Sequence, residues 1–279
     1  MSLVAPISSS KTEGLVARWA VNTSKWSPSE EEFEYLLRKV QPEEQQRIRK
    51  FHFKRDAKLA LAGRLLQRRF VQDYFEVEWK DVVLIRTPEG RPALQTPSPI
   101  LPSGAKVDFN ISHHGDWVVF VAAVDYAVGV DVVQVKPPSE PLEKYFEAFT
   151  ELFSDFEWKN IRAGNSTEDM LMRFFRHWSL KESFVKAIGT GLSFDLNRVE
   201  FNESQEGDWK ANTNCIVKVD KTIQNNWRFE QTTLDDIHWV SVCLGRPDAT
   251  SLPEENAASA PQFDILLPSQ LYSPAYPSE

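Results

Sequence analysis

Trp178-Ser179-Leu180-Lys181-Glu182-Ser183-Phe184-Val185-Lys186 is the stretch that decides how this chain of 279 residues folds. A helix turns by about 100° per residue, so Glu182 falls near the centre of one face, and further apolar side chains occupy the opposite face. A helix that is apolar nearly all round is predicted to be buried. The face with Glu182 also carries Leu171, Phe175, Trp178, Val185 and Lys186, and the opposite face carries Leu180, Phe184 and Ile188.

An acid on such a helix needs a partner, because burying an unpaired carboxylate costs several kcal/mol of folding free energy. Lys186 follows Glu182 by one helical turn and could form an ion pair with it. Binding of a metal ion would satisfy the carboxylate equally well. The helix alone leaves both interpretations open.

A second carboxylate, Asp131, lies in the strand-like segment Val128-Gly129-Val130-Asp131-Val132-Val133. Alternation puts the side chain of Asp131 on the face shared with Gly129 and away from the valine layer. Backbone donors at a strand end could hold this carboxylate. Alternatively, Asp131 and Glu182 meet and bind a divalent cation, for which Mg²⁺ fits best, because it prefers oxygen ligands and no set of His and Cys residues indicates zinc.

Working outward, the apolar pattern, prolines and glycines predict a mixed order of helices and strands. Helices are expected from 27–30 to 38 with Pro28 in the first turn, from 42, over 54–74, within 142–162 and over 167–188. Strands are expected at 15–21, 82–86, 107–111, 117–124, 128–133, 198–201, 215–219, 227–231 and 238–244. The strands at 117–124 and 128–133 are expected to form a hairpin, and 93–105 a surface loop.

These elements predict an α+β fold of two similar αβ halves rather than a regular βαβ series. The N-terminal half is placed at 14–126 and the C-terminal half, with both acids, at 127–246. A Pro- and Ser-rich tail follows at 247–279, within which the apolar run 263–267 is expected to dock on the body.

Composition and charge limit the function classes. An apolar content of 42% supports a full core, and Cys215 and Cys243 are too few for a disulfide framework. No signal peptide and no apolar run of about 20 residues is present, so we expect a cytoplasmic protein that does not enter membranes. The net charge of −8 argues against nucleic-acid binding.

One segment is strongly basic despite this net charge. Between Arg47 and Arg69 there are nine cationic residues and a single acid, Asp56. Such a run favours an anionic ligand or partner, although a solvated helix face would have the same composition. Further candidates for anion binding are Arg86, Arg91 in Gly90-Arg91-Pro92, and Ser112 and His113 in Phe109-Asn110-Ile111-Ser112-His113-His114-Gly115. A structural role is an equally simple interpretation of a lone histidine or an exposed arginine.

Taken together, these motifs resemble the phosphopantetheinyl transferase superfamily, in its Sfp-like branch and the animal aminoadipate-semialdehyde-dehydrogenase type. The resemblance covers most of the chain. Val-Gly-Val-Asp at 128–131 followed by the motif at 178–186 is its most specific part. Phe-Asn-Ile-Ser-His at 109–113, Gly-Arg-Pro at 90–92 and the basic segment between 53 and 65 add to it. It implies halves related by pseudo-twofold symmetry and, with them, a monomer.

The resemblance implies transfer of 4′-phosphopantetheine from coenzyme A (CoA) to a serine of acidic acyl or peptidyl carrier domains, such as those of fatty acid synthase or aminoadipate reductase-like proteins. Asp131 and Glu182 would hold Mg²⁺, Glu182 would act as the general base, and Lys186 would neutralise the pyrophosphate. The positions implied to bind the nucleotide half are Arg47, Arg86, Thr87, Gly90, Arg91, Asn110, Ser112, His113 and Lys186.

Two positions depart from the pattern of the family. Bacterial relatives place a third acid where this chain has Val133, and His114 stands where animal-type relatives offer a polar side chain. A water is therefore expected as a further Mg²⁺ ligand. A non-catalytic carrier-binding module of the same fold, or a different CoA- or nucleotide-binding protein, remain the alternative hypotheses.

Overall fold

The computed structural model describes residues 14–203, 215–253 and 262–272, which form a mixed α+β structure. These residues belong to two compact units. Unit 1 runs to Asp125 and takes in the chain again from Phe263, and unit 2 lies between, from Tyr126 to Gln262. No helix of the described residues has the length and apolar character needed to cross a lipid bilayer.

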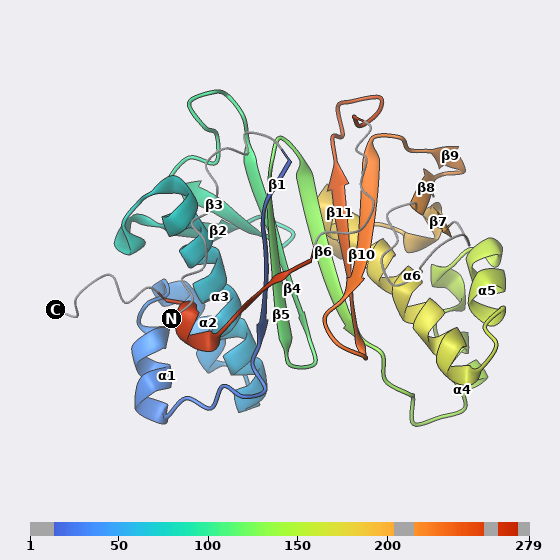
Figure 1. Cartoon of the computed structure of the whole chain (residues 1–279), viewed down its shortest axis with the longest axis horizontal. Helices are drawn as coiled ribbons and strands as arrows, with labels where there is room; N and C mark the ends of the chain where they lie inside the picture. The colour runs from blue at the N-terminus through green and yellow to red at the C-terminus, as the bar shows by residue number, and fades with distance from the viewer. Residues whose placement is uncertain (1–13, 204–214, 254–261, 273–279) are drawn as a thin grey trace. The chain divides into compact units, whose positions relative to one another are not determined.

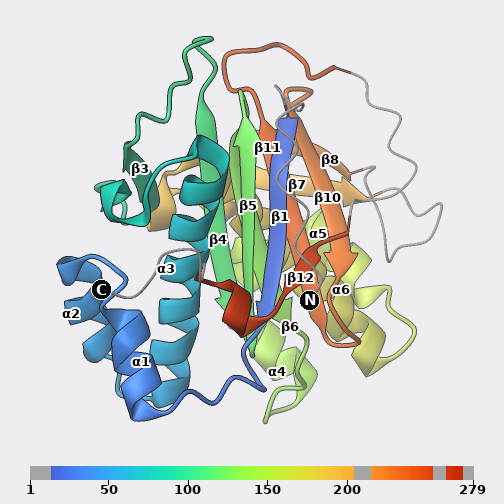
Figure 2. The same ribbon diagram turned by 60° about the vertical axis from the view of Figure 1, so that its left-hand side comes forward.

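Unit 1 is built on a four-stranded sheet in the order β12-β1-β5-β4. Its strands are β1 (Gly14–Asn22), β4 (Val107–His114), β5 (Trp117–Val124) and β12 (Asp264–Leu266). The helices α1 (Glu30–Leu37), α2 (Pro42–Arg49) and α3 (Lys54–Phe75) lie on one side of this sheet, as both views show (Figures 1 and 2). A separate hairpin joins β2 (Val83–Arg86) and β3 (Pro92–Thr96).

The strand β12 comes from the C-terminal tail and pairs with β1 in parallel. Phe263, Leu266 and Leu271 are buried, and Leu266 and Leu271 belong to the same core as α3 and β5. The apolar run expected to dock on the body therefore extends the sheet of unit 1, because its backbone finds hydrogen-bond partners along the edge of β1.

Unit 2 carries a sheet in the order β10-β11-β6, formed by β10 (Trp227–Thr233), β11 (His238–Gly245) and β6 (Ala127–Gln134). A small sheet contains β7 (Val199–Glu203), β8 (Cys215–Val219) and β9 (Thr222–Ile223). The helices are α4 (Leu142–Glu147), α5 (Asp155–Arg162) and α6 (Thr167–Ile188). Ser166 caps the start of α6, and Gly189 ends it in a left-handed conformation.

Three local predictions were wrong. The strand at 117–124 does not form a hairpin with 128–133, because β1 and β4 occupy both of its edges. The expected loop at 93–105 begins with β3, whose Pro92 stands at the strand end, where its missing N–H is tolerated. Ser29 caps α1, so Pro28 lies before the helix and not in its first turn.

Candidate functional site

Gly129 brings α6 into direct contact with β6. A Cβ atom at this position would lie 2.0 Å from the carbonyl oxygen of Ser183 and 2.5 Å from the backbone nitrogen of Ala187. Only a glycine permits this approach of helix and strand. Asp131 follows two residues later on the same face of β6, so its side chain meets the turn of α6 that carries Glu182 and Lys186.

Lys186 pairs with Asp131 across this contact. Its Nζ atom lies 2.5 Å from Oδ1 of Asp131, and the side chain of Asp131 is 9% exposed against 28% for Lys186. The ammonium group therefore neutralises the strand carboxylate while staying open to solvent. The sequence left a pair between Lys186 and Glu182 open, and the structure pairs Lys186 with Asp131.

Glu182 is the second carboxylate of this cluster and is half-buried. Its burial, together with the nearby charge of Asp131, raises the pKa of the Glu182 carboxyl, and the positive charge of Lys186 offsets this only in part. Glu182 thus lies near a carboxylate whose charge is already paired with Lys186. This donor set fits a divalent cation such as Mg²⁺, which binds one or two carboxylates together with substrate phosphates and water.

The surroundings offer no third protein acid. Val133, two residues beyond Asp131, is buried and has no ligand atom, and no group of three or more metal-ligating side chains occurs within the described residues. His114 lies at the end of β4 in unit 1 and is exposed. If a Mg²⁺ ion binds, Asp131 and Glu182 are the carboxylates that would hold it, and such an ion usually takes substrate phosphates and water as further ligands.

A buried polar cluster fixes α6 on the sheet beside this site. The hydroxyl oxygens of Ser179 and Ser241 are 2.6 Å apart, and Ser241 is the register partner of Asp131 on the neighbouring strand. Gln231 donates to the Ser241 hydroxyl at 3.1 Å and accepts from the Arg176 guanidinium at 2.9 Å. Because these directional contacts lie between helix and sheet, they resist sliding of α6 along β6 and β11.

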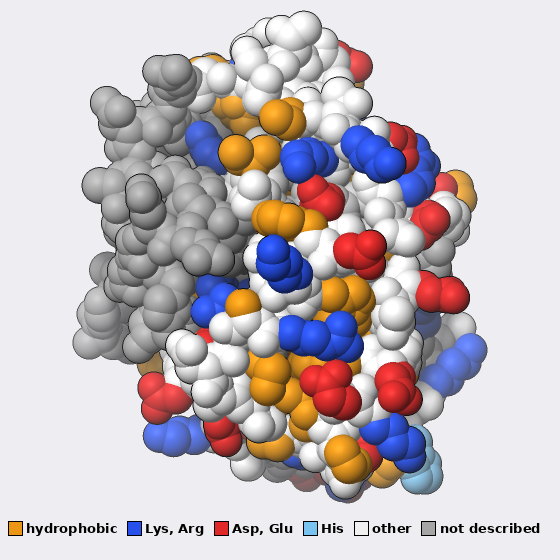
Figure 3. Space-filling view, turned by 90° about the vertical axis from the view of Figure 1, so that its right-hand side faces the viewer, with side chains coloured by type: hydrophobic (Ala, Val, Ile, Leu, Met, Phe, Trp, Pro, Cys, Tyr) orange, Lys and Arg blue, Asp and Glu red, His pale blue; other side chains and the backbone are white. Residues whose placement is uncertain are grey.

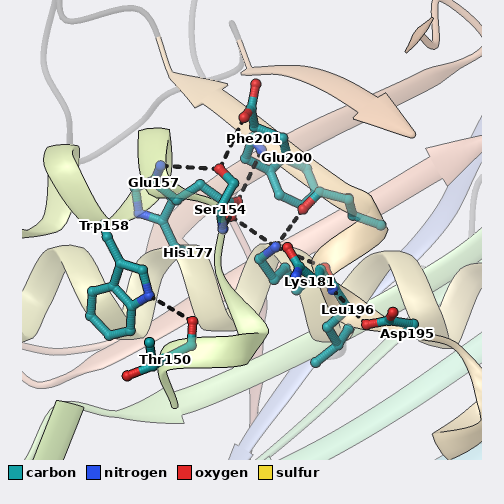
Figure 4. Close-up of polar contacts among 12 residues, drawn as sticks. Thr150, Ser154, Glu157, Trp158, His177, Lys181, Asp195, Leu196, Glu200 and Phe201 are labelled. Carbon is teal, nitrogen blue, oxygen red and sulfur yellow. Dashed lines mark hydrogen bonds and ion pairs between the residues drawn. The ribbon is translucent and has the colours of Figure 1, made fainter. Parts of the chain in front are cut away.

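Lys181 holds α6 on its other side and was not singled out from the sequence. Lys181 and Glu157 are both fully buried, with Nζ 2.9 Å from Oε2 of Glu157 (Figure 4). Lys181 also donates to the carbonyl oxygens of Leu196 and Val199. The second carboxylate oxygen of Glu157 accepts from the backbone N–H of Phe201 at 3.0 Å. The ion pair therefore joins α5, α6 and the start of β7.

The signals for this pair were weak in the sequence. Ser154 and Glu157 form a capping box at the start of α5, which predicts a local role only. Burial lowers the pKa of Lys181, and the charge of Glu157 opposes that effect. The sequence indicated a buried role for Lys181 only through its place on a helix that is apolar nearly all round.

Unit 1 contains a polar cavity of about 720 Å³ that brings together three of the predicted anion-binding residues. Arg47 of α2, Arg86 at the end of β2 and His113 of β4 all line it. Lys50 and Arg64 add further positive charge to the same walls. The basic run of the sequence thus contributes to a cavity, and the cavity can bind an anion.

Glu44 of α2 organises this cavity and was missed by the sequence analysis. Its carboxylate accepts from Arg86 at 2.9 and 3.1 Å and pairs with Arg64 at 2.8 Å. These two guanidinium groups hold the pKa of Glu44 below its usual range against the effect of burial. Burial lowers the pKa of Arg64 to about 10. Glu44 therefore orients cations that would otherwise repel one another.

Alternation along β4 separates the remaining predicted residues. Ile111 and His113 line the cavity, so Asn110 and Ser112, which are buried, lie on the opposite face of the strand. Arg91 donates to Asp108 at 2.7 Å and to the carbonyl oxygen of Phe109 at 3.1 Å.

The turn before Arg91 is built from Thr87 and Gly90. The backbone N–H of Arg91 donates to the Thr87 hydroxyl at 3.3 Å, and Gly90 has a φ of +88°. The carbonyl oxygen of Gly90 accepts from Arg86 at 2.9 Å. Thr87, Gly90 and Arg91 thus fix Arg86 from the side opposite Glu44.

Replacing Gly129 by alanine is expected to destabilise the chain by about 1–3 kcal/mol, because the added methyl group meets backbone atoms that cannot rotate away. Chemical denaturation measures this loss. Gly63→Ala is the matched control, since its Cβ would meet only side-chain atoms, the nearest being the flexible end of Ile111 at 3.0 Å. Equal stability of the Gly129→Ala variant and the unsubstituted chain would contradict the close approach of α6 and β6.

Replacing Glu44 by alanine is expected to weaken binding of pyrophosphate in this cavity by about tenfold, because Arg64 and Arg86 lose their shared carboxylate. Glu44 also has a lowered pKa, so its stabilising effect is present above the ordinary carboxyl range and is lost as pH falls through the lowered pKa. The Glu44→Ala variant should therefore lose less of its free energy of unfolding than the unsubstituted chain when the pH is lowered through this range. Asp73→Ala, which breaks the pair with Arg69 at 3.0 Å near the surface, serves as the control. Unchanged binding of pyrophosphate, measured by calorimetry, would contradict the orienting role of Glu44.

Comparison with known proteins identifies the chain. The family model described as 4′-phosphopantetheinyl transferase, N-terminal, matches residues 24–125, and the model described as 4′-phosphopantetheinyl transferase superfamily matches residues 127–243. Among relatives, the L-aminoadipate-semialdehyde dehydrogenase-phosphopantetheinyl transferase of Mus musculus is 37% identical over 93% of this chain and 86% of its own length.

Two further relatives agree with this assignment. The protein of the same name from Xenopus laevis is 40% identical over 83% of this chain and 76% of its own length. The 4′-phosphopantetheinyl transferase Sfp of Bacillus subtilis is 29% identical over 79% of this chain and 88% of its own length. The chain therefore belongs to the 4′-phosphopantetheinyl transferase superfamily and is an enzyme that transfers phosphopantetheine from CoA to carrier proteins.

Proposed function

We propose that this enzyme uses Asp131, Glu182 and Lys186 as its catalytic cluster and acts on the serine of apo acyl or peptidyl carrier domains. The observation that carries this proposal is the pair of coupled carboxylates beside one partly exposed ammonium group, within the region matched by the superfamily model. Such a cluster suits a reaction at a pyrophosphate, where negative charge must be offset and a hydroxyl proton removed.

The reaction exchanges one phosphorus–oxygen bond for another. The serine oxygen of the carrier attacks the phosphorus that bears the pantetheine arm, and the bond from that phosphorus to the bridging oxygen breaks. Adenosine 3′,5′-bisphosphate leaves with the electron pair of that bond. Glu182 takes the serine proton directly or through a water. Its half-buried position and its raised pKa suit it to act as a general base.

Lys186 and Asp131 have supporting roles in this scheme. Lys186 donates to Asp131, and because its side chain is partly exposed, the same ammonium group can also interact with a pyrophosphate oxygen of bound substrate. Asp131 holds Lys186 in place and, with Glu182, would bind Mg²⁺. A Mg²⁺ ion bound by the two carboxylates would supply further charge neutralisation on the pyrophosphate.

The nucleotide half of CoA is assigned to the cavity of unit 1. Arg47, Arg86 and His113 supply donors for its phosphates, with Arg86 held by Glu44. Thr87, Gly90 and Arg91 support Arg86 through the turn that they form. Asn110 and Ser112 are proposed to contribute from the other face of β4, as the family resemblance implies.

The carrier domains that this enzyme modifies are proposed from the names of its relatives. The name of the mouse relative points to an aminoadipate reductase-like carrier domain. We also propose that the enzyme modifies carrier domains of fatty acid synthase. It is further proposed to be cytoplasmic and monomeric. A non-catalytic carrier-binding module is the alternative.

Mass spectrometry tests the proposed reaction directly. A panel of apo carrier domains is incubated with the full chain, CoA and Mg²⁺, and the mass gain of phosphopantetheine is measured together with release of adenosine 3′,5′-bisphosphate. Both products are expected, and both should disappear when a chelator removes the metal. Carrier binding without either product would favour the non-catalytic alternative.

A further inference from the structure

Four polar side chains meet between α6 and the strands β10 and β11 of unit 2, and none of them is more than 6% exposed. They are Arg176 and Ser179 of α6, Gln231 of β10 and Ser241 of β11. Ser179 and Ser241 are fully buried. Polar groups in such a place are shielded from bulk water, so they need hydrogen-bond partners within the protein.

The charged side chains on the surface of the same unit are in a different situation. Across the face of unit 2 in Figure 3, Lys and Arg lie among Asp and Glu, and water can solvate all of them. Arg198 and Asp220, for example, pair at 2.6 Å but are 49% and 58% exposed. Exposed pairs of this kind do little to fix neighbouring elements, whereas breaking a buried hydrogen bond leaves a group unsatisfied.

The direction of each buried hydrogen bond follows from the groups that make it. A carbonyl oxygen only accepts, so the Ser179 hydroxyl donates to the backbone carbonyl of Arg176 at 3.0 Å. The one proton of that hydroxyl is then used, so across the 2.6 Å contact Ser241 donates to Ser179. Ser241 accepts in turn from the Gln231 amide at 3.1 Å. The Arg176 guanidinium donates to the Gln231 side-chain oxygen at 2.9 Å.

These four hydrogen bonds form a closed ring, because the last donor and the first acceptor both belong to Arg176. All four run in the same sense around the ring. Hydrogen bonds arranged in this way polarise and strengthen one another. Loss of any one member is therefore expected to weaken the whole ring.

The ring adjoins the proposed catalytic cluster on both the sheet and the helix. Ser241 is the register partner of Asp131, so the two side chains leave neighbouring strands on the same face. Ser179 precedes Glu182 by three residues on α6, and residues three apart are neighbours on a helix. The ring thus joins β11 to α6 at the level of Asp131, and the close contact at Gly129 joins β6 to α6 two residues earlier.

We propose that this hydrogen-bond ring positions the catalytic cluster, by setting the distance between Asp131 on β6 and the turn of α6 that carries Glu182 and Lys186. The inference rests on the proposed function, and the ring members act as positioning residues that do not contact the substrate. Lys186 reaches Asp131 at 2.5 Å only while helix and sheet keep this spacing. Small displacements matter, because a shift of about 1 Å at a reacting group can lower a rate by about 100-fold.

Steady-state kinetics with a purified apo acyl carrier protein tests the positioning. Ser241→Ala removes one oxygen atom, and it is expected to lower kcat by about three- to tenfold while the KM for CoA stays within about twofold. Cys243→Ala is the matched control, since it removes one atom from a fully buried side chain of the same strand, outside the ring. An unchanged kcat, an equal loss in the control, or an effect on the KM for CoA alone would overturn the proposal.

A second variant opens the ring from the helix. Ser179→Ala should lower kcat by a similar factor. The double variant Ser179→Ala/Ser241→Ala should be no slower than the slower single variant, because both substitutions open the same ring. Losses that multiply in the double variant would show two independent contacts and would overturn the ring.

NMR spectra of the full chain without substrate separate the ring from the proposed function. The side-chain amide protons of Gln231 should exchange slowly with water, and Ser179→Ala or Ser241→Ala should speed this exchange by at least about tenfold. Ser241→Ala should also shift the ammonium signal of Lys186 more than Cys243→Ala does.

Unchanged exchange at Gln231 would overturn the ring, and an equal or smaller shift at Lys186 would overturn its positioning role. Absence of transfer by the unsubstituted chain, with both NMR results as expected, would contradict the proposed function and leave the ring standing.

Discussion

Replacing Glu182 by glutamine is expected to reduce transfer of phosphopantetheine by at least about 100-fold, which is the lower range for removing a general base. The glutamine side chain keeps the shape of Glu182 but cannot accept the serine proton, and it is a weaker ligand for Mg²⁺. Transfer is measured by the mass gain of an apo carrier at saturating CoA.

The same variant should be no less stable than the unsubstituted chain in metal-free buffer at neutral pH. Burial and the charge of Asp131 both disfavour the ionised form of Glu182, which is why its pKa is raised. Removing that charge relieves repulsion, so a loss of activity here does not reflect unfolding. Glu168→Gln in the exposed first turn of the same helix is the control and should retain full transfer. Full transfer by the Glu182→Gln variant would contradict the proposed mechanism.

Replacing Lys181 by methionine is expected to lower the free energy of unfolding by about 3–5 kcal/mol, the usual cost of leaving one member of a buried ion pair without its partner. Glu157 is fully buried, and among the described residues its carboxylate would keep the backbone N–H donors of Ser154 and Phe201. The carbonyl oxygens of Leu196 and Val199 would also lose a donor. Denaturant unfolding measures the change.

The double variant Lys181→Met/Glu157→Gln separates the charge from the packing. Its stability should recover much of the loss, because no unpaired charge then remains in the interior. Lys144→Met provides the exposed control, since Lys144 and Glu140 are paired at 3.3 Å in solvent and should contribute less than about 1 kcal/mol. If Lys181→Met costs no more than this control, the ion pair does not fasten α6.

Much of the secondary structure was predictable because its signals are local. Gly189 ends α6 as expected, and Pro42 lies in the first turn of α2. Pairing of strands was harder to predict, since it depends on neighbours far apart in the chain. The strand at 117–124 was given the wrong partner for this reason, since its true neighbours are β1 and β4.

The candidate site shows the same division. Asp131, Glu182 and Lys186 were identified from their unusual places in apolar segments and from the family resemblance. The ion-pair partners of these residues were not predicted. An ion pair forms between side chains that are close in space, and such residues can be far apart in the sequence. The pairs Asp131–Lys186 and Glu157–Lys181 each link residues on different elements. Glu44 looked like an ordinary acid in the first turn of a helix, and only the fold placed Arg64 and Arg86 around it.

The sequence by itself determined most of the elements and the family, and it singled out Asp131, Glu182 and Lys186 as candidates, because apolar periodicity, caps and motif spacing are properties of the chain order. The tertiary structure decided which carboxylate Lys186 neutralises and which lysine is buried. These outcomes depend on how closely α6 approaches β6 at Gly129, and close packing is set by the whole fold.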